Sequence, residues 1–317
     1  MSGIEAIADE LRTASRIAVA GHVGPDGDAL GSMLGLAMAA RAAGKEAFAT
    51  FGEPFVMPHQ LEFLNTETLM TVSDVPRPLD LLVVVDCGDR ERLGTAAVLA
   101  DDAARVAVID HHRTNGGFGD ASWVEPDAGA TAQMVHRLLA HLGWQVDKAI
   151  AEALYTGVVT DTGRFQYSST SPEVHEIAAR LLQSGVEPDR IGQALFASSP
   201  FAYLGVAGAV MSRASLEPEL SLVWSSLPAE DLESAGIGYE AADGLIDLIR
   251  IAEEAQVACL LREVGETRTK ASLRSRGVID VGSVAHALGG GGHHNAAGFT
   301  VDATVDEAIE MVREALR

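Results

Sequence analysis

The chain has 317 residues, of which 47% are apolar, and it carries a formal net charge of −22. This length predicts about two domains, and the apolar fraction is typical of globular rather than disordered proteins. With two cysteines and no run of about 18 apolar residues, the sequence predicts neither a disulfide framework nor a membrane span. The first residues lack the basic and apolar regions of a signal peptide, so we expect a cytoplasmic protein.

The element pattern is that of an α/β protein with two domains. We expect strands at residues 17–20, 45–51, 81–85 and 106–109 and helices at 30–43, 130–142, 150–159 and 172–183, which predicts a mostly parallel sheet with helices on both faces. The remainder combines strands at 220–224, 256–263 and 267–273 with helices at 282–287 and 305–316, which predicts a smaller α+β domain. The predicted domains are residues 1–196 and 218–317, joined by a linker over residues 197–217.

Clusters of aspartate and histidine follow the predicted strands. They are His22 with Asp26 and Asp28, then Asp86, then the run Asp110-His111-His112; Asp161 lies near the end of a predicted helix. Because the carboxyl ends of parallel strands converge on one crevice, we expect the strand-end residues to meet in space. Carboxylates and imidazoles gathered in this way would repel one another or stay unpaired unless a cation bound them. The economical interpretation is a site for two metal ions.

The types of ligand limit which metals can bind and which reactions they can support. Aspartate and histidine without cysteine suit Mn²⁺, Mg²⁺, Fe²⁺ or Zn²⁺ rather than a thiolate site. Two such ions about 3.5–4 Å apart form the usual clamp for in-line displacement at phosphorus. The sequence therefore predicts phosphoester hydrolysis.

The acidic balance limits the expected substrate. A protein that grips a long nucleic acid presents a basic surface to the phosphates, whereas a chain with a net charge of −22 would repel a long polyanion except where metals or local arginines reverse the field. A nucleotide or very short oligonucleotide is a more favourable substrate than a long strand. The acidity also serves solubility, and the sequence leaves both explanations open.

The order and spacing of these motifs resemble the DHH phosphoesterase superfamily, in particular its bacterial nanoRNase and pAp-phosphatase branch with the cyclic-di-AMP phosphodiesterases. The run Gly-Gly-Gly-Gly-His-His-Asn-Ala-Ala-Gly at residues 289–298 resembles the signature of the accompanying DHHA1 domain. The resemblance implies a catalytic DHH domain, a substrate-binding DHHA1 domain, two divalent metal ions, most commonly Mn²⁺, and a homodimer.

The resemblance also implies roles for single residues. His22 and Asp26 would hold one metal, Asp28, His111 and Asp161 the other, and Asp86 would bridge them. The catalytic set would be Asp86 with His112, which faces the substrate phosphate or leaving group, and Asp110, which orients an imidazole. The implied substrate contacts are Arg113, Asn115, Ser272, Arg274, Ser275, Gly291, Gly292, His293 and His294. The glycines among them would form a nest of backbone amides for phosphate.

The implied function is hydrolysis of short nucleotides to nucleoside monophosphates by a hydroxide that two metals activate. The substrates would be oligoribonucleotides of two to four units, pApA or cyclic di-AMP, or 3′-phosphoadenosine 5′-phosphate.

A family II inorganic pyrophosphatase has similar N-terminal motifs, but its Ser-Arg-Lys phosphate clamp does not occur in this chain. The short, strongly acidic chain disfavours a RecJ-like exonuclease. A nucleotide-binding protein without catalysis would be marked by the loss of a metal ligand, and every expected ligand is present.

Overall fold

The structure is a computed structural model that describes residues 3–238, 242, 244–265 and 267–317. The chain divides into two compact units, Met1–Ala197 and Ser198–Arg317. Each unit has its own sheet and its own apolar core. Among the described residues, no helix combines the length and the apolar composition that crossing a membrane requires.

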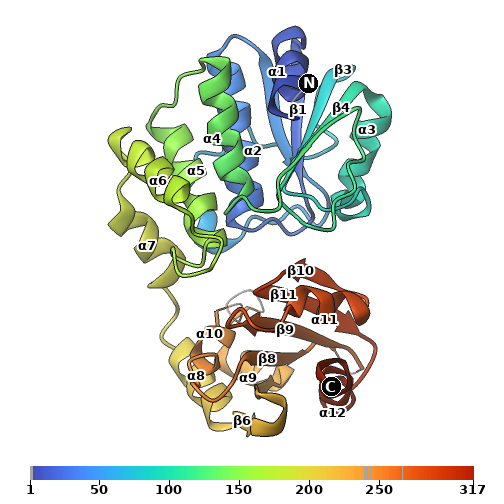
Figure 1. The fold of residues 1–317 in the computed structure, drawn as a ribbon, viewed down its shortest axis with the longest axis vertical. Helices are drawn as coiled ribbons and strands as arrows, with labels where there is room; N and C mark the ends of the chain where they lie inside the picture. The colour runs from blue at the N-terminus through green and yellow to red at the C-terminus, as the bar shows by residue number, and fades with distance from the viewer. Residues whose placement is uncertain (1–2, 239–241, 243, 266) are drawn as a thin grey trace. The chain divides into compact units, whose positions relative to one another are not determined.

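The N-terminal unit is built on a parallel sheet of five strands in the order β2-β1-β3-β4-β5. Strands β1, β3 and β4 of this sheet are labelled in Figure 1. The strands are β1 (Arg16–Gly21), β2 (Glu46–Phe51), β3 (Leu79–Val85), β4 (Ala103–Asp110) and β5 (Ala121–Val124). Residues 81–85 of β3 are all apolar and buried, as in a strand covered on both faces. The predicted α/β fold is confirmed, although the short strand β5 was not predicted.

Helices cover both faces of this sheet. They are α1 (Gly3–Thr13), α2 (Gly27–Ala42), α3 (Val98–Asp102), α4 (Thr131–Leu142), α5 (Lys148–Asp161), α6 (Pro172–Gln183) and α7 (Pro188–Phe196), with 3₁₀ turns η1 (His59–Leu61) and η2 (Glu91–Ala97). Ile17 and Val19 of β1 face the core formed with α1, α2, α4, α5 and α6, whereas Ala18 and Ala20 face the smaller core with η2 and α3. This alternation follows from the two-residue period of a strand.

The C-terminal unit is a mixed sheet of six strands in the order β10-β11-β9-β8-β7-β6. The strands are β6 (Ser215–Glu217), β7 (Leu222–Leu227), β8 (Val257–Glu263), β9 (Thr269–Ser275), β10 (Gly291–His293) and β11 (Ala296–Val301). The helices are α8 (Tyr203–Ser212), α9 (Ala229–Ala235), α10 (Ile246–Ile249), α11 (Val281–Ala287) and α12 (Val305–Leu316), with the turn η3 (Pro218–Leu220). The first three helices pack on one face of the sheet, and α11 and α12 pack on the other.

The segment expected to be a linker, residues 197–217, contains regular structure. It forms α8, which buries Val206 and Val210 in the C-terminal core, and β6, which pairs with β7. The run Ser198-Ser199-Pro200 interrupts the chain only locally, because the apolar stretch after it can form a helix against the sheet. Helix α7 was likewise not predicted. The N-terminal unit ends one residue beyond the predicted boundary at residue 196, whereas residues 198–217 belong to the C-terminal unit rather than to a linker.

Glu217 at the end of β6 binds this edge of the sheet to the C-terminal helix. Its carboxylate accepts hydrogen bonds from Trp224 Nε1 (2.7 Å) and Arg313 Nε (3.0 Å). The hydrogen bond from Arg313 outweighs burial and holds the pKa of Glu217 below its ordinary value of 4.5. The carboxylate therefore stabilises the fold above that value, and the stabilisation is lost as the pH falls through the lowered pKa.

We expect Glu217→Gln to lower the thermal midpoint of unfolding at pH 7. The free energy of unfolding should fall by about 1–2 kcal/mol, because the hydrogen bonds to a charged group are lost. The difference from the wild type should shrink as the pH falls below 4.5, because Glu217 of the unfolded chain then takes up a proton, and should level off below the lowered pKa, where Glu217 is protonated in both states. Thermal unfolding monitored by circular dichroism between pH 3.5 and 7 measures this. A difference that stays constant over the range would contradict the role of the charge.

Candidate metal centre

The loop after β1 carries the first two candidate ligands. His22 Nδ1 lies 3.0 Å from the carbonyl oxygen of Val23, and because a carbonyl can only accept, Nδ1 carries the hydrogen. His22 Nε2 then lies 3.8 Å from carboxylate oxygens of both Asp26 and Asp86. Asp26 is the N-cap of α2, and its Oδ1 accepts the backbone N–H groups of Asp28 and Ala29, each at 3.0 Å. One oxygen of Asp26 thus fixes the helix while the other faces His22.

Asp86 lies at the centre of the cluster. It follows the last residue of β3 with φ +52°, a left-handed conformation that is unfavourable for a residue with a Cβ and is often found at functional sites. Its Oδ2 lies 3.8 Å from His22 Nε2. Its Oδ1 lies 3.5 Å from His111 Nε2 and accepts a hydrogen bond from Thr131 Oγ1 at 2.9 Å. The carboxylate therefore directs one oxygen to each histidine, as a bridging ligand would.

His111 faces three carboxylates. Its Nδ1 lies 3.0 Å from the carbonyl oxygen of Ala128, which orients Nε2 toward the cluster. Nε2 lies 3.3 Å from Asp161 Oδ2, 3.5 Å from Asp86 Oδ1 and 3.7 Å from Asp28 Oδ2. The second predicted set of ligands is therefore brought together as well.

Close packing of α2 against α5 places Asp28 near Asp161. A Cβ on Gly31 of α2 would lie 2.3 Å from the carbonyl oxygen of Ala153, so the two backbones approach as closely as a glycine allows. A Cβ on Gly157 of α5 would lie 2.7 Å from Asp28 Oδ1. The start of α2, which carries Asp28, consequently lies against the end of α5, whose last residue is Asp161.

The N-terminus of α4 completes the surroundings of Asp28. Asp28 Oδ2 accepts the backbone N–H of Thr131 at 2.6 Å, and Oδ1 accepts that of Ala132 at 2.8 Å. Thr131 thus holds Asp28 through its backbone and Asp86 through its hydroxyl. Thr131 was not among the predicted site residues; the signal for it in the sequence is a hydroxyl residue at the start of a predicted helix.

Asp110 orients His112. The two groups lie 2.7 Å apart between Asp110 Oδ1 and His112 Nδ1. The second oxygen of Asp110 accepts from Asn115 Nδ2 at 2.7 Å. Asn115 also donates to the carbonyl of Cys87 and accepts the backbone N–H of Gly117. Both polar atoms of the buried Asn115 side chain are thus engaged within the protein, and this residue supports Asp110. Its expected contact with substrate stays a prediction.

Burial and mutual repulsion shape the electrostatics of the cluster. Burial raises the pKa of Asp161 to about 7, and burial together with Asp86 and Asp161 raises the pKa of Asp28 well above its ordinary value. Burial opposes the charge on His111, but the carboxylates of Asp161, Asp86 and Asp28 outweigh it and raise its pKa to about 9. A bound cation would balance the negative charge that raises these pKa values.

These residues fit two divalent cations. One group of possible ligands is His22, Asp26 and Asp86, and another is Asp28, Asp86 and His111; the ligand atoms of each group lie within 4.8 Å of one another. The two groups share Asp86. Oxygen and imidazole donors suit Mn²⁺, Mg²⁺, Fe²⁺ or Zn²⁺. The nearby Cys87 belongs to neither group, and its Sγ donates to the carbonyl of Asp89 at 3.1 Å.

Of the other predicted substrate contacts, Arg113 belongs to the N-terminal unit and the rest belong to the C-terminal unit. The side chain of Arg113 is 74% exposed and lies 3.5 Å from Asp127. Ser272, Arg274, Ser275, Gly291, Gly292, His293 and His294 all belong to the C-terminal unit. The Ser275 hydroxyl is buried and accepts the backbone N–H of Gly277 at 2.9 Å, and His294 Nε2 lies 3.0 Å from the carbonyl of Gly277.

The glycine run expected to form a phosphate nest is partly a strand. Gly291 and Gly292 belong to β10, which pairs with β11 as a hairpin. Gly292 has φ +139°, and a Cβ there would lie 2.5 Å from the Cα of Ala297. Backbone packing of the hairpin therefore accounts for this glycine without a ligand.

The comparisons with known proteins agree with the motifs. The model of the DHH family N-terminal domain matches residues 16–158, and the DHHA1 domain model matches residues 227–317. The bifunctional oligoribonuclease and PAP phosphatase NrnA of Thermus thermophilus is 40% identical over 304 residues, which cover 95% of this chain and 89% of that protein. The chain belongs to the DHH/DHHA1 phosphoesterase family. The resemblance inferred from the sequence is confirmed.

Further relatives extend this DHH/DHHA1 assignment. The cyclic-di-AMP phosphodiesterase GdpP of Geobacillus thermodenitrificans is 27% identical over 98% of this chain and 48% of that protein. Among solved structures, an exopolyphosphatase-related protein from Bacteroides fragilis has a TM-score of 0.90 at 27% identity, covering 99% of this chain and 95% of that one. The likeness to these two proteins thus spans nearly the whole chain.

Proposed function

We propose that this protein is a metal-dependent phosphoesterase that hydrolyses short nucleotides to nucleoside monophosphates. The observation that carries the proposal is the pair of ligand groups that share Asp86. The 40% identity to an oligoribonuclease and PAP phosphatase supports the substrate class, as does the likeness to a cyclic-di-AMP phosphodiesterase. We include Mn²⁺ as the metal and a homodimer as the assembly in this proposal.

Each side chain of the centre has a distinct task. His22 and Asp26 would hold one cation, and His111, Asp28 and Asp161 the other, with Asp86 contacting both. When bound, two such ions supply Lewis-acid activation of water and neutralise charge on the phosphate. The carboxylates of Asp26 and Asp28 are held in place before substrate arrives, because their hydrogen bonds to the N-termini of α2 and α4 are already made.

His112 is suited to donate a proton to the leaving oxygen. Its Nδ1 is held by Asp110 at 2.7 Å, which leaves Nε2 as the atom that can reach a substrate. Burial disfavours its charged form, but Asp110 and Asp86 raise its pKa. A protonated imidazole in a fixed orientation is the usual form of a general acid. Asn115 extends this chain of hydrogen bonds through Asp110.

We expect His112→Gln to lower kcat for pApA about 10²–10⁴-fold, the range for loss of a general acid or base. The Mn²⁺-dependent rise in the unfolding temperature should persist, because His112 is not among the proposed ligands. Steady-state kinetics and thermal unfolding with and without Mn²⁺ measure the two effects. If the variant lost the response to Mn²⁺ instead, His112 would be a ligand.

The proposed function is tested by a turnover assay with Mn²⁺. The substrates are pApA, cyclic di-AMP, 3′-phosphoadenosine 5′-phosphate and pyrophosphate, each with an EDTA control. We expect AMP from the adenine compounds, with turnover abolished by EDTA. Cleavage of pyrophosphate alone would indicate a pyrophosphatase, and no turnover of any substrate would indicate a nucleotide-binding protein.

A further inference from the structure

The N-terminus of α4 is capped by a residue of another helix. Its own N-cap residue is Ala130, whose side chain cannot accept a hydrogen bond. The first backbone N–H groups of a helix have no partner within that helix. Here the N–H groups of Thr131 and Ala132 donate to the two carboxylate oxygens of Asp28, at 2.6 and 2.8 Å. Asp28, a proposed metal ligand, therefore also caps α4, although it lies 103 positions from Thr131 in the chain.

This arrangement stabilises the charge on Asp28 as well as the helix. The side chain of Asp28 is buried, and a buried carboxylate costs free energy unless hydrogen bonds satisfy it. Helix α4 has 12 residues, and its aligned backbone dipoles place partial positive charge at the N-terminus that faces Asp28. Backbone N–H groups that donate to a carboxylate form charge-assisted hydrogen bonds, which are stronger than those between neutral groups. The position of this ligand is thus tied to the position of α4.

The hydroxyl of Thr131 reaches a second proposed ligand. Thr131 is fully buried, and its Oγ1 donates to Asp86 Oδ1 at 2.9 Å. Among the described residues, this is the hydrogen bond that an uncharged group gives to the Asp86 carboxylate. The torsion about the Cβ–Cγ bond of an aspartate is broad, so a fixed donor decides how its two oxygens are directed. With Oδ1 held by the hydroxyl, Oδ2 faces His22.

Thr131 consequently connects the two groups of metal ligands. Its backbone holds Asp28, which belongs to one group, and its side chain holds Asp86, which belongs to both. We propose that Thr131 is a positioning residue, whose N–H and hydroxyl keep these two carboxylates in the relation that binding of two cations requires. The proposal rests on the proposed function and adds to it a residue outside the set of ligands.

Thr131→Val tests the hydroxyl, because valine has nearly the shape of threonine and keeps the backbone N–H that binds Asp28. We expect the variant to bind Mn²⁺ about 10–100-fold more weakly, the usual effect of removing the partner of a metal ligand. It should also lower kcat for pApA, whereas KM for pApA at saturating Mn²⁺ should change little, because Thr131 contacts ligands rather than substrate. Calorimetric titration with Mn²⁺ and steady-state kinetics measure these effects.

Two further variants of Thr131 separate positioning from a purely structural role. Thr131→Ser restores the hydroxyl without the methyl group, so its Mn²⁺ affinity should be close to that of the wild type. Thr131→Ala removes the hydroxyl in a smaller side chain and should show the same loss of affinity as Thr131→Val, so the test does not depend on the folding of one variant. A lowered unfolding temperature in EDTA with an unchanged Mn²⁺ affinity would show that Thr131 serves only the fold. Weak binding by Thr131→Ser would also overturn the role of the hydroxyl.

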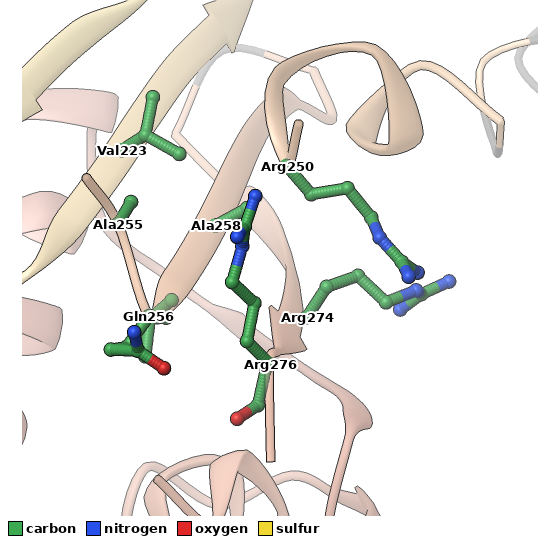
Figure 2. A pocket seen from close by; sticks show the side chains of 9 residues that line it. Val223, Arg250, Ala255, Gln256, Ala258, Arg274 and Arg276 are labelled. Carbon is green, nitrogen blue, oxygen red and sulfur yellow. The ribbon is translucent and has the colours of Figure 1, made fainter. Parts of the chain in front are cut away.

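Two controls lie elsewhere in the protein. Thr50 of β2 is also fully buried, but its hydroxyl has no hydrogen-bond partner among the described residues, so Thr50→Val should bind Mn²⁺ as the wild type does. Arg274 of β9 lines a pocket of the C-terminal unit with Arg250 and Arg276 (Figure 2). All the proposed metal ligands belong to the N-terminal unit. Arg274→Gln should therefore keep the Mn²⁺ affinity of the wild type, and any change in its kinetics should be in KM.

The positioning role and the proposed function can fail separately, because titration with Mn²⁺ requires no turnover. Weaker binding of Mn²⁺ by Thr131→Val, together with no cleavage of any nucleotide by the wild type, would refute the proposed function but retain the positioning role. Cleavage of pApA at equal rates by both proteins, with equal Mn²⁺ affinities, would retain the function and refute the positioning role. No binding of Mn²⁺ by the wild type would refute both.

Discussion

Asp86→Asn should lower kcat for pApA by on the order of a thousandfold or more, because it removes a charge from both groups of metal ligands at once. Asparagine has nearly the same shape as aspartate and can still accept the hydrogen bond from Thr131. Its amide nitrogen cannot serve as a second metal-binding atom. The fold should therefore persist while the bridge between the two cation sites is lost.

Thermal unfolding separates the loss of metal from a loss of folding. In EDTA the variant should unfold at the same temperature as the wild type or above it, since Asp86 contributes to the repulsion that raises the pKa values of Asp28 and Asp161. Added Mn²⁺ should raise the unfolding temperature of the wild type and do so much less for the variant. Asp74→Asn, in an exposed turn of the same unit, is the control and should behave as the wild type. Unchanged turnover in Asp86→Asn would refute the assignment of the site.

Gly31→Ala should destabilise the N-terminal unit by about 1–3 kcal/mol, the usual cost of overpacking. A Cβ at this position would lie 2.3 Å from the carbonyl oxygen of Ala153, a backbone atom that cannot rotate away, so α2 and α5 must separate. Because these helices carry Asp28 and Asp161, we also expect weaker binding of Mn²⁺. Chemical unfolding and calorimetric titration with Mn²⁺ measure the two effects.

A second glycine provides the control of opposite sign. Gly192 in α7 has no atom within 4 Å of an added Cβ, so Gly192→Ala should stabilise the protein by about 0.5–1 kcal/mol through helix propensity alone. Its Mn²⁺ affinity should equal that of the wild type. If both substitutions had the same effect, helix propensity rather than the contact between α2 and α5 would explain the result.

The sequence by itself determined the family, the α/β class and the set of residues that meet in the metal centre. It could do so because His22, Asp86 and His111 each follow an apolar strand, and parallel strands present their carboxyl ends at one edge of a sheet. The spacing of those motifs in the chain carries the information. No knowledge of side-chain packing was needed to predict that these residues lie together.

Only the tertiary structure decided which groups support the ligands. Thr131 donates to Asp28 across 103 positions in the chain and to Asp86 across 45, and no local pattern encodes such pairings. Asn115 follows the DHH triplet closely, yet its amide binds Asp110 because the loop after β4 folds inward. A sequence shows which side chains are available, but the partner of each polar atom depends on the packing of distant segments.

Packing between distant segments also explains why the sequence did not predict the start of the C-terminal unit. Ser198-Ser199-Pro200 indicated a linker, but α8 forms because the sheet offers an apolar face on which Val206 and Val210 are buried. Helical and strand periods show that a segment can form an element, and burial against another segment decides whether it does.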